Sequence, residues 1–175
     1  MQQKTSIGFW NNKNINDQIG GLFKDQNFLT ANSFLFSVHF QALREENFEL
    51  LGWVLAKKAA LYLLVNELKN AFDEFSNSRL EKYKYNWNRE DYYYFFQLIL
   101  LDISIVPQIK PIYKNEMEKQ SFLEALLYLR ERKYKPIDVI LKILEVDASE
   151  VLKDMETFKK IPNNGVSIPP NGFTA

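Results

Sequence analysis

The sequence predicts an all-α fold, a single-domain helical bundle of about five to seven helices. Hydrophobic residues make up 46% of the 175 residues, enough for a sizeable core. Apolar residues recur three and four positions apart along several segments, as on one face of a helix. No strand-like alternation of comparable strength and no repeat of 20 to 50 residues is evident.

Two helices are predicted before residue 46. Residues 1–14, rich in Asn and Gln, form an irregular N-terminal arm, and the helical domain spans 15–160. Residues 15–24 favour a short helix that Gly20 and Gly21 weaken. Thr30 is the predicted N-cap of a helix that runs to about Glu45. Its apolar spacing is carried by Phe34, Leu35 and Val38.

The strongest helical pattern lies between Asn47 and Ser76. Asn47 is the predicted N-cap of one long helix from Phe48 to about Phe75. Ser76, Asn77 and Ser78 end it. Its apolar stripe is made of Leu61, Leu64, Val65, Leu68, Phe72 and Phe75.

A further helix should begin near Asn88, because Glu90 and Asp91 would then lie in its first turn, where the helix dipole favours acids. It should stop before Pro107, since a proline disfavours helical geometry in the residue before it. Residues 107–113 are a predicted connector.

Three more helices are predicted in the last part of the domain. The first spans about 115–132, with Phe122, Leu126 and Leu129 on one face. Pro136 suits the first turn of the second. Asp147 and Glu150 have the spacing of a helix start for the last, through about Lys160.

The Pro/Asn/Gly-rich tail, residues 161–175, is predicted to be extended or flexible. Its three prolines oppose a helix, and its two Asn-Gly pairs indicate turns. It is either an unstructured end or a peptide that lies in a groove of a partner, with Ile168 and Phe173 as anchors.

Composition excludes several classes of function. With 22 Lys and Arg against 22 Asp and Glu, the chain lacks the basic excess usual in proteins that bind DNA nonspecifically. It has no cysteine, which removes disulfides, thiolate metal sites and cysteine nucleophiles. Its longest apolar runs are shorter than the roughly 18 to 20 residues that span a bilayer. Without a secretory signal at the N-terminus, the cytoplasm is the expected compartment.

No catalytic, cofactor-binding or metal-ligating motif is visible, so the chain is not expected to be an enzyme. Glycine-rich phosphate loops and a nucleophile elbow are missing from the sequence. The single histidine, His39, is more typical of a structural residue than of a catalytic one. Asp102, within an apolar helix, is expected to cap or to form a salt bridge. A catalytic site that includes either residue, without a recognisable motif, remains an alternative function.

Residues 129–156 resemble the helix-turn-helix of bacterial repressors. The positions that match its turn and packing residues are Leu144, Val146, Ser149 and Val151. Leu141 departs from the small residue usual between the helices, and Glu145 replaces the usual turn glycine. The second helix carries Glu150, Asp154 and Glu156 but only one basic residue, Lys153. Such an acidic helix is unfavourable for binding in the anionic groove of DNA. Two packed helices of a bundle explain the same residues.

The segment from Lys82 to Phe96 holds five of the nine tyrosines. In extended geometry, Lys82 to Trp87 would alternate aromatic and polar side chains. Tyr92 to Phe96, aromatic throughout, predict the start of a buried central helix. The aromatic and basic residues are Lys82, Tyr83, Lys84, Tyr85, Trp87 and Arg89. They can lie at the margin of the core, form a protein interface, or stack nucleic acid bases or sugars.

Together these features favour a non-catalytic interaction, assembly or inhibitory subunit. Its partner would be another protein or a second copy, bound through the aromatic and basic stretch and the tail anchors Ile168 and Phe173. The alternative is a nucleic-acid-associated protein that uses residues 82–89 or the helix-turn-helix-like segment 129–156.

Overall fold

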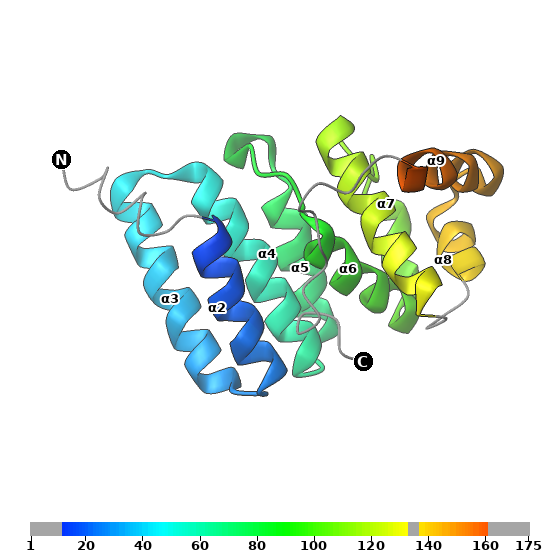
Figure 1. Cartoon of the computed structure of the whole chain (residues 1–175). Coiled ribbons are helices and arrows are strands. Elements are labelled where there is room, and N and C mark those ends of the chain that lie inside the picture. Colours follow the sequence, from blue (N-terminus) through cyan, green and yellow to red (C-terminus); the bar gives the residue numbers. More distant parts are fainter. Residues whose placement is uncertain (1–11, 133–136, 161–175) are drawn as a thin grey trace.

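The computed structural model describes residues 12–132 and 137–160 (Figure 1). The predicted all-α class is confirmed: this part of the chain contains eight α-helices and no strand. The α-helices are α2 (Asn12–Lys24), α3 (Phe28–Glu45), α4 (Phe48–Leu64), α5 (Leu68–Ser78), α6 (Arg89–Leu101), α7 (Glu116–Glu131), α8 (Ile137–Leu144) and α9 (Ala148–Lys160). Two 3₁₀ helices, η1 (Glu81–Tyr83) and η2 (Ile103–Gln108), lie on either side of α6.

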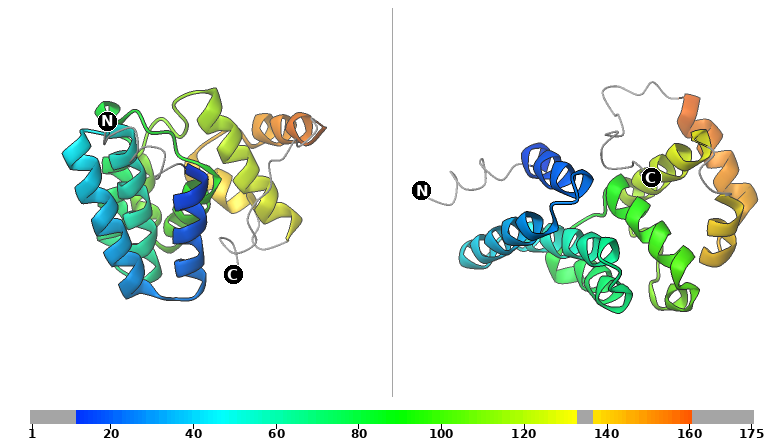
Figure 2. Two further views of the ribbon diagram at one scale, coloured as in Figure 1. Left: turned by 60° about the vertical axis from the view of Figure 1, so that its left-hand side comes forward. Right: turned by 90° about the horizontal axis from the view of Figure 1, so that it is seen from below.

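From α4 on, the helices follow one another in chain order toward the other end of the molecule (Figure 1). Helix α3 lies at one end, beside α2 and α4, and α8 and α9 lie at the opposite end (Figures 1 and 2). Helix α4 packs against α3, α5 and α6, and α6 packs against α7 and α8. The two central helices therefore connect the halves of the molecule, and α3 is left as an edge.

The core is built on α4 and α6, each of which contains a run of residues that are buried on every side of the helix. Every residue from Leu50 to Lys57 of α4 is buried, and so is every residue from Asp91 to Phe96 of α6. This confirms the predicted central position of Tyr92 to Phe96. The indole of Trp87 packs edge-to-face on Phe75 and Tyr92, with ring centroids 5.3 and 5.1 Å apart.

The helix starts follow asparagine caps. Asn47, Asn88 and Asn115 accept hydrogen bonds from backbone N–H groups in the first turns of α4, α6 and α7. The predicted cap at Thr30 is wrong: Asn27 caps α3, and the Thr30 N–H donates to its Oδ1 at 3.4 Å. Helix α2 begins at Asn12, three residues inside the predicted arm.

The long helix predicted over Phe48 to Phe75 is two helices. Helix α4 ends at Leu64, Asn66 adopts a left-handed backbone with φ 64°, and the Glu67 N–H donates to the Tyr62 carbonyl at 2.8 Å. Asparagine tolerates this conformation, which lets the chain reverse into α5. The apolar stripe from Leu61 to Phe75 continues across the break, because both helices of the hairpin turn their apolar sides to the core.

Helix α6 ends earlier than Pro107, at Leu101. The Asp102 carboxylate accepts hydrogen bonds from the Ser104 N–H at 3.1 Å and the Ser104 hydroxyl at 2.6 Å. This Asx-type arrangement turns the chain into η2. Asp102 is thus a capping residue, one of the two roles predicted for it.

Candidate interaction surface

Helix α3 is apolar on two opposite sides. Its inner side, made of Ala31, Leu35, Val38 and Ala42, is fully buried. Its outer side carries Leu29, Phe36, Phe40 and Leu43, which are 85%, 73%, 57% and 53% exposed. We call these four residues the outer stripe of α3. Because α3 is the edge of the helix array, nothing in the described part of the chain covers them.

The outer stripe follows helical spacing as regularly as the inner side does. Successive members are seven, four and three residues apart, so they fall on one line along the helix. At about 200 Å² per side chain, the four exposed fractions amount to roughly 500 Å² of apolar surface. The largest apolar patch of an ordinary monomer is about 300–600 Å², and such patches are often functional.

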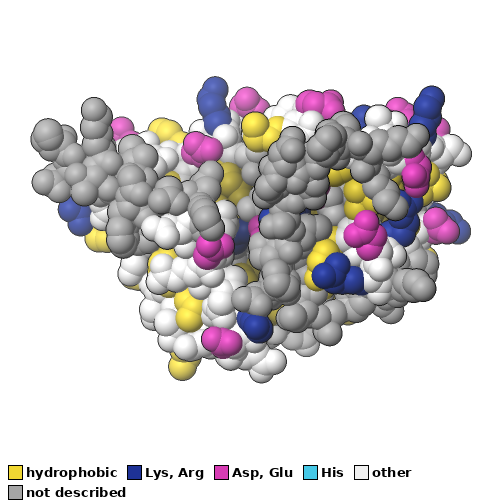
Figure 3. Space-filling view, viewed as in Figure 1, with side chains coloured by type: hydrophobic (Ala, Val, Ile, Leu, Met, Phe, Trp, Pro, Cys, Tyr) yellow, Lys and Arg dark blue, Asp and Glu magenta, His cyan; other side chains and the backbone are white. Residues whose placement is uncertain are grey.

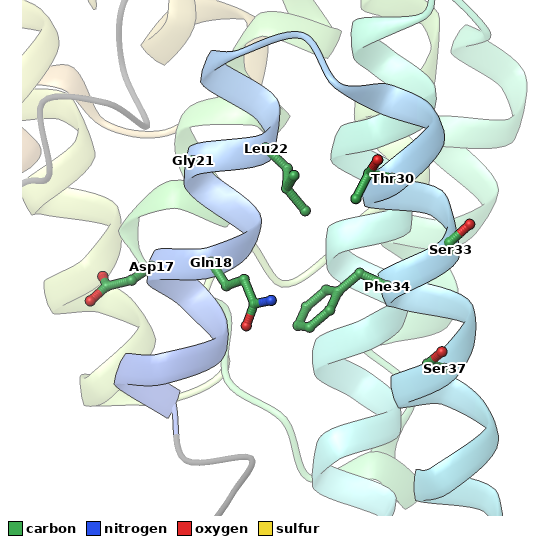
Figure 4. Close-up of a pocket in the computed structure, with 8 residues that line it drawn as sticks. All are labelled: Asp17, Gln18, Gly21, Leu22, Thr30, Ser33, Phe34 and Ser37. Carbon is green, nitrogen blue, oxygen red and sulfur yellow. The ribbon is translucent and has the colours of Figure 1, made fainter.

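A groove between α2 and α3 runs along one flank of the outer stripe (Figure 4). Its volume is about 510 Å³, and it is lined by Asp17, Gln18, Gly21, Leu22, Thr30, Ser33, Phe34 and Ser37. Gln18 and Leu22 point toward α3, whereas Asp17 points away (Figure 4). A side chain added at Gly21 would meet nothing within 4 Å, so the groove is open there.

Helix α3 itself carries no charged side chain along the outer stripe. From Phe28 to Leu43 the sequence holds no Asp, Glu, Lys or Arg, and Arg44 is the first charged residue. His39 lies on the flank opposite the groove. Burial and the nearby Lys58 lower the pKa of His39, while Glu74 acts in the opposite direction. At neutral pH the stretch of α3 from Phe28 to Leu43 therefore carries no net charge. In the space-filling view, hydrophobic side chains reach the surface over α2 and α3 (Figure 3).

No family model, curated protein or solved structure matches this chain. Within the described residues, no helix has both the length and the apolar character needed to cross a bilayer. The same residues contain no group of three or more His, Cys, Asp or Glu that could hold a metal ion. The geometry of the surface is thus the basis for a functional proposal.

The predicted aromatic and basic surface is divided by the structure. Lys82 and Lys84 are exposed and Tyr83 is half-buried, whereas Tyr85 and Trp87 are buried. The extended geometry considered for this segment is wrong at its start, because Glu81–Tyr83 is a 3₁₀ helix and Lys84 has a left-handed backbone with φ 52°. Tyr85 and Trp87 nevertheless turn inward and Lys82 and Lys84 outward. Three roles were considered for these residues: the margin of the core, a protein interface, and a surface that stacks bases or sugars. Tyr85 and Trp87 lie at the margin of the core.

Hydrogen bonds fix both buried aromatics. The Tyr85 hydroxyl donates to Asp91 Oδ2 at 2.6 Å. The Trp87 backbone N–H donates to Glu118 Oε2 at 2.8 Å, and its indole N–H donates to Ser78 Oγ at 2.8 Å. Since both polar tips are satisfied inside the protein, these side chains hold the segment between α5 and α6 in place.

Arg89 lies at the start of α6, 3.7 Å from Glu124 on α7. Burial raises the pKa of Glu124, and the Arg89 charge counteracts that rise. Arg89 thus has a partner within the chain. The tail anchors Ile168 and Phe173 lie outside the described residues, so their predicted role stays a prediction.

The turn between α8 and α9 lies in the segment that resembles a helix-turn-helix, and it has the same left-handed backbone as the turns before α3, α4 and α5. Helix α8 ends at Leu144, α9 begins at Ala148, and Glu145 has a φ of 58°. This is the left-handed region that glycine adopts most easily, which explains the glycine usual at this position. Two acids of α9 are paired with cations of α7: Asp154 lies 3.0 Å from Lys119, and Glu156 lies 3.3 Å from Arg130.

The outer stripe is the surface that the sequence prediction missed. The prediction of this helix used one apolar side, that of Phe34, Leu35 and Val38. The sequence also contains a second line of large apolar residues at the same spacing. A helix with a single buried side does not need this second line, so it was a signal for a further contact surface. Neither His39 nor Asp102 lines the groove between α2 and α3, so neither residue is part of a site there.

Proposed function

We propose that this chain is a non-catalytic interaction or assembly subunit that docks through the outer stripe of α3. The observation that carries the proposal is the exposure of Leu29, Phe36, Phe40 and Leu43 in one line along an edge helix. Leaving this apolar area in water is unfavourable, at about 25 cal/mol per Å². Covering it in a complex removes that cost, and aromatic side chains are enriched in such contacts.

Residues 82–89, the predicted aromatic and basic segment, have a structural role in this proposal. Tyr85 and Trp87 stabilise the join between α5 and α6, which positions the central helices that support α3. Lys82 and Lys84 remain accessible and can add charged contacts at the rim of a partner surface.

The test compares a stripe variant with a matched control at another exposed apolar site. Phe36→Gln with Phe40→Gln removes the two rings, and Leu101→Gln with Ile103→Gln removes exposed apolar side chains near the end of α6. Self-association is measured by sedimentation velocity, and partner capture by pull-down from the native host. The stripe variant should lose at least one of these associations, and the control should retain it. If neither measurement detects an association of the unmodified chain, the proposal is wrong.

A second candidate function, nucleic acid binding, is favoured by one observation, the pairing of Asp154 and Glu156 on α9 with cations of α7. This pairing reduces the net negative charge that α9 presents. Ser149 and Lys153 are exposed and would be available to a duplex.

Salt dependence tests this candidate. Binding of a fluorescent duplex should weaken steeply between about 50 and 200 mM salt, because phosphate contacts release counterions. Lys153→Glu should abolish binding, and Lys142→Glu on α8 is the matched charge control. Binding that is absent at low salt would exclude this function.

A further inference from the structure

We infer that the outer stripe of α3 pairs with the same stripe of a second copy, antiparallel, about a two-fold axis at Phe36. This inference rests on the proposed function and names the partner. A two-fold dimer uses the same patch on both copies, so the patch must be complementary to itself. Three features of the stripe meet that condition: its spacing, its charge and its area.

Three of the four stripe residues are symmetric about Phe36, and Phe40 is the exception. Leu29 lies seven residues before Phe36, and Leu43 lies seven residues after it. Seven residues correspond to about 10.5 Å along a helix. Reversing the helix therefore places Leu29 of one copy opposite Leu43 of the other at both ends, with the two Phe36 rings at the centre.

Phe40 has a different counterpart in this arrangement. The position that faces it on the second copy is near Asn32 and Ser33, both of which are exposed. Ser33 is also part of the wall of the α2–α3 groove. The small serine leaves room for the Phe40 ring of the second copy at the mouth of the groove, where Leu22 and Phe34 supply apolar contact.

Charge favours the antiparallel orientation over the parallel one. A parallel pair would bring Arg44 of one copy close to Arg44 of the other, at the same end of the two helices. In the antiparallel pair, Arg44 lies beside the first turns of the other α3, which hold Thr30 and Asn32 and no charged residue. Like charges in contact are unfavourable, so the antiparallel pair avoids a repulsion that the parallel pair carries.

The area lies at the lower limit for a specific dimer. Each copy exposes roughly 500 Å² of apolar surface on the stripe, so complete burial of both stripes would cover about 1,000 Å². A biological interface needs about 1,000 Å² in total. The stripe therefore reaches the lower limit of a specific, reversible dimer.

Cysteine cross-linking tests the geometry, because the chain has no cysteine of its own. All of the variants replace exposed side chains, and circular dichroism checks that each one folds. Under mild oxidation, Phe36→Cys should link to itself, and an equimolar mixture of Leu29→Cys and Leu43→Cys should give the mixed dimer. Leu29→Cys alone should not link, because its two copies would lie about 21 Å apart, beyond the reach of about 7 Å between the Cα atoms of a disulfide.

The contrary results are equally defined. If Leu29→Cys and Leu43→Cys each link to themselves, the helices are parallel and the inference is wrong. If Leu101→Cys, the exposed control on α6, links as efficiently as Phe36→Cys, the cross-links are collisional and the inference is wrong.

Sedimentation separates this inference from the proposed function. The unmodified chain should sediment as a dimer at about 100 µM, and Phe36→Gln should raise the dissociation constant at least about tenfold, since each dimer loses two central rings. A monomer that captures another protein through the stripe overturns self-pairing alone. A monomer whose stripe variants change no association overturns both.

Discussion

Lys57 on α4 and Asp91 on α6 form a buried ion pair, with Lys57 Nζ 2.9 Å from Asp91 Oδ1. The other oxygen of the same carboxylate accepts hydrogen bonds from the Tyr85 hydroxyl and from the Asn88 N–H at 2.9 Å. Burial raises the pKa of Tyr85 well above its usual value, so its hydroxyl stays protonated and donates. One carboxylate thus joins α4, the start of α6 and the aromatic segment before it.

Removing one member of this pair should strongly destabilise the fold. Asp91→Asn leaves the Lys57 charge buried without its carboxylate, and Lys57→Met leaves the Asp91 charge without its cation. Each change is expected to cost about 3–5 kcal/mol of unfolding free energy. Urea denaturation followed by circular dichroism measures the loss.

The double variant Lys57→Met with Asp91→Asn provides the control, because it leaves no unpaired charge. It should lose less stability than the sum of the two single variants, which a double-mutant cycle reports directly. Additive losses would mean that the two side chains do not interact.

Gly52 and Gly21 form a second matched pair of positions. A Cβ at Gly52 would overlap the Cβ of Tyr85 and lie 3.1 Å from the Cβ of Tyr83, whereas a Cβ at Gly21 meets nothing. Gly52→Ala should therefore cost about 1–3 kcal/mol through overpacking. Gly21→Ala should stabilise α2 by up to about 1 kcal/mol, since alanine favours a helix. Thermal unfolding of both variants should shift in opposite directions; a shift in the same direction would contradict the contact at Gly52.

Local signals in the sequence predicted much of the fold. The asparagine caps of α4, α6 and α7, the buried run from Tyr92 to Phe96 and the helix start at Asp147 depend on neighbours a few residues away. The break at Asn66 was missed, because apolar spacing continues across it and only the left-handed φ ends the helix.

The candidate surface was harder to predict, because exposure depends on tertiary position. Tyr85 and Trp87 looked accessible beside Lys82 and Lys84, yet both are buried. The Tyr85 hydroxyl donates to Asp91, and the Trp87 indole packs on Phe75 and Tyr92. The stripe residues Phe36 and Phe40 have the composition of a core, and only the position of α3 at the edge exposes them. Sequence spacing identifies an apolar side but does not say which side another helix covers.

The turn before α9 offers a test of backbone strain. Glu145 has a φ of 58°, a conformation that costs a non-glycine residue roughly 1 kcal/mol. Glu145→Gly should raise the melting temperature if relief of this strain exceeds the added freedom of the unfolded chain. Glu145→Ala is the control, because it removes the exposed pair with Lys110 and keeps the Cβ. Equal melting temperatures for the two variants would mean that relief of the strain does not exceed the added freedom of the unfolded chain.

His39 should make stability depend on pH just below neutrality. Burial and Lys58 hold its pKa below that of a free histidine, about 6.5, so the unfolded chain binds the proton more readily than the folded chain does. Stability should be complete above about pH 6.5 and should fall as the pH decreases toward the lower pKa of the folded state. His39→Gln removes the titrating imidazole. Both proteins have the same carboxylates, so the difference between their stabilities at each pH isolates the contribution of His39. Urea midpoints measured from pH 7.5 to 5.5 should therefore diverge, with the unmodified chain losing more stability. Parallel curves would mean that folding does not perturb the imidazole, and a steeper loss in His39→Gln would reverse the assigned sign.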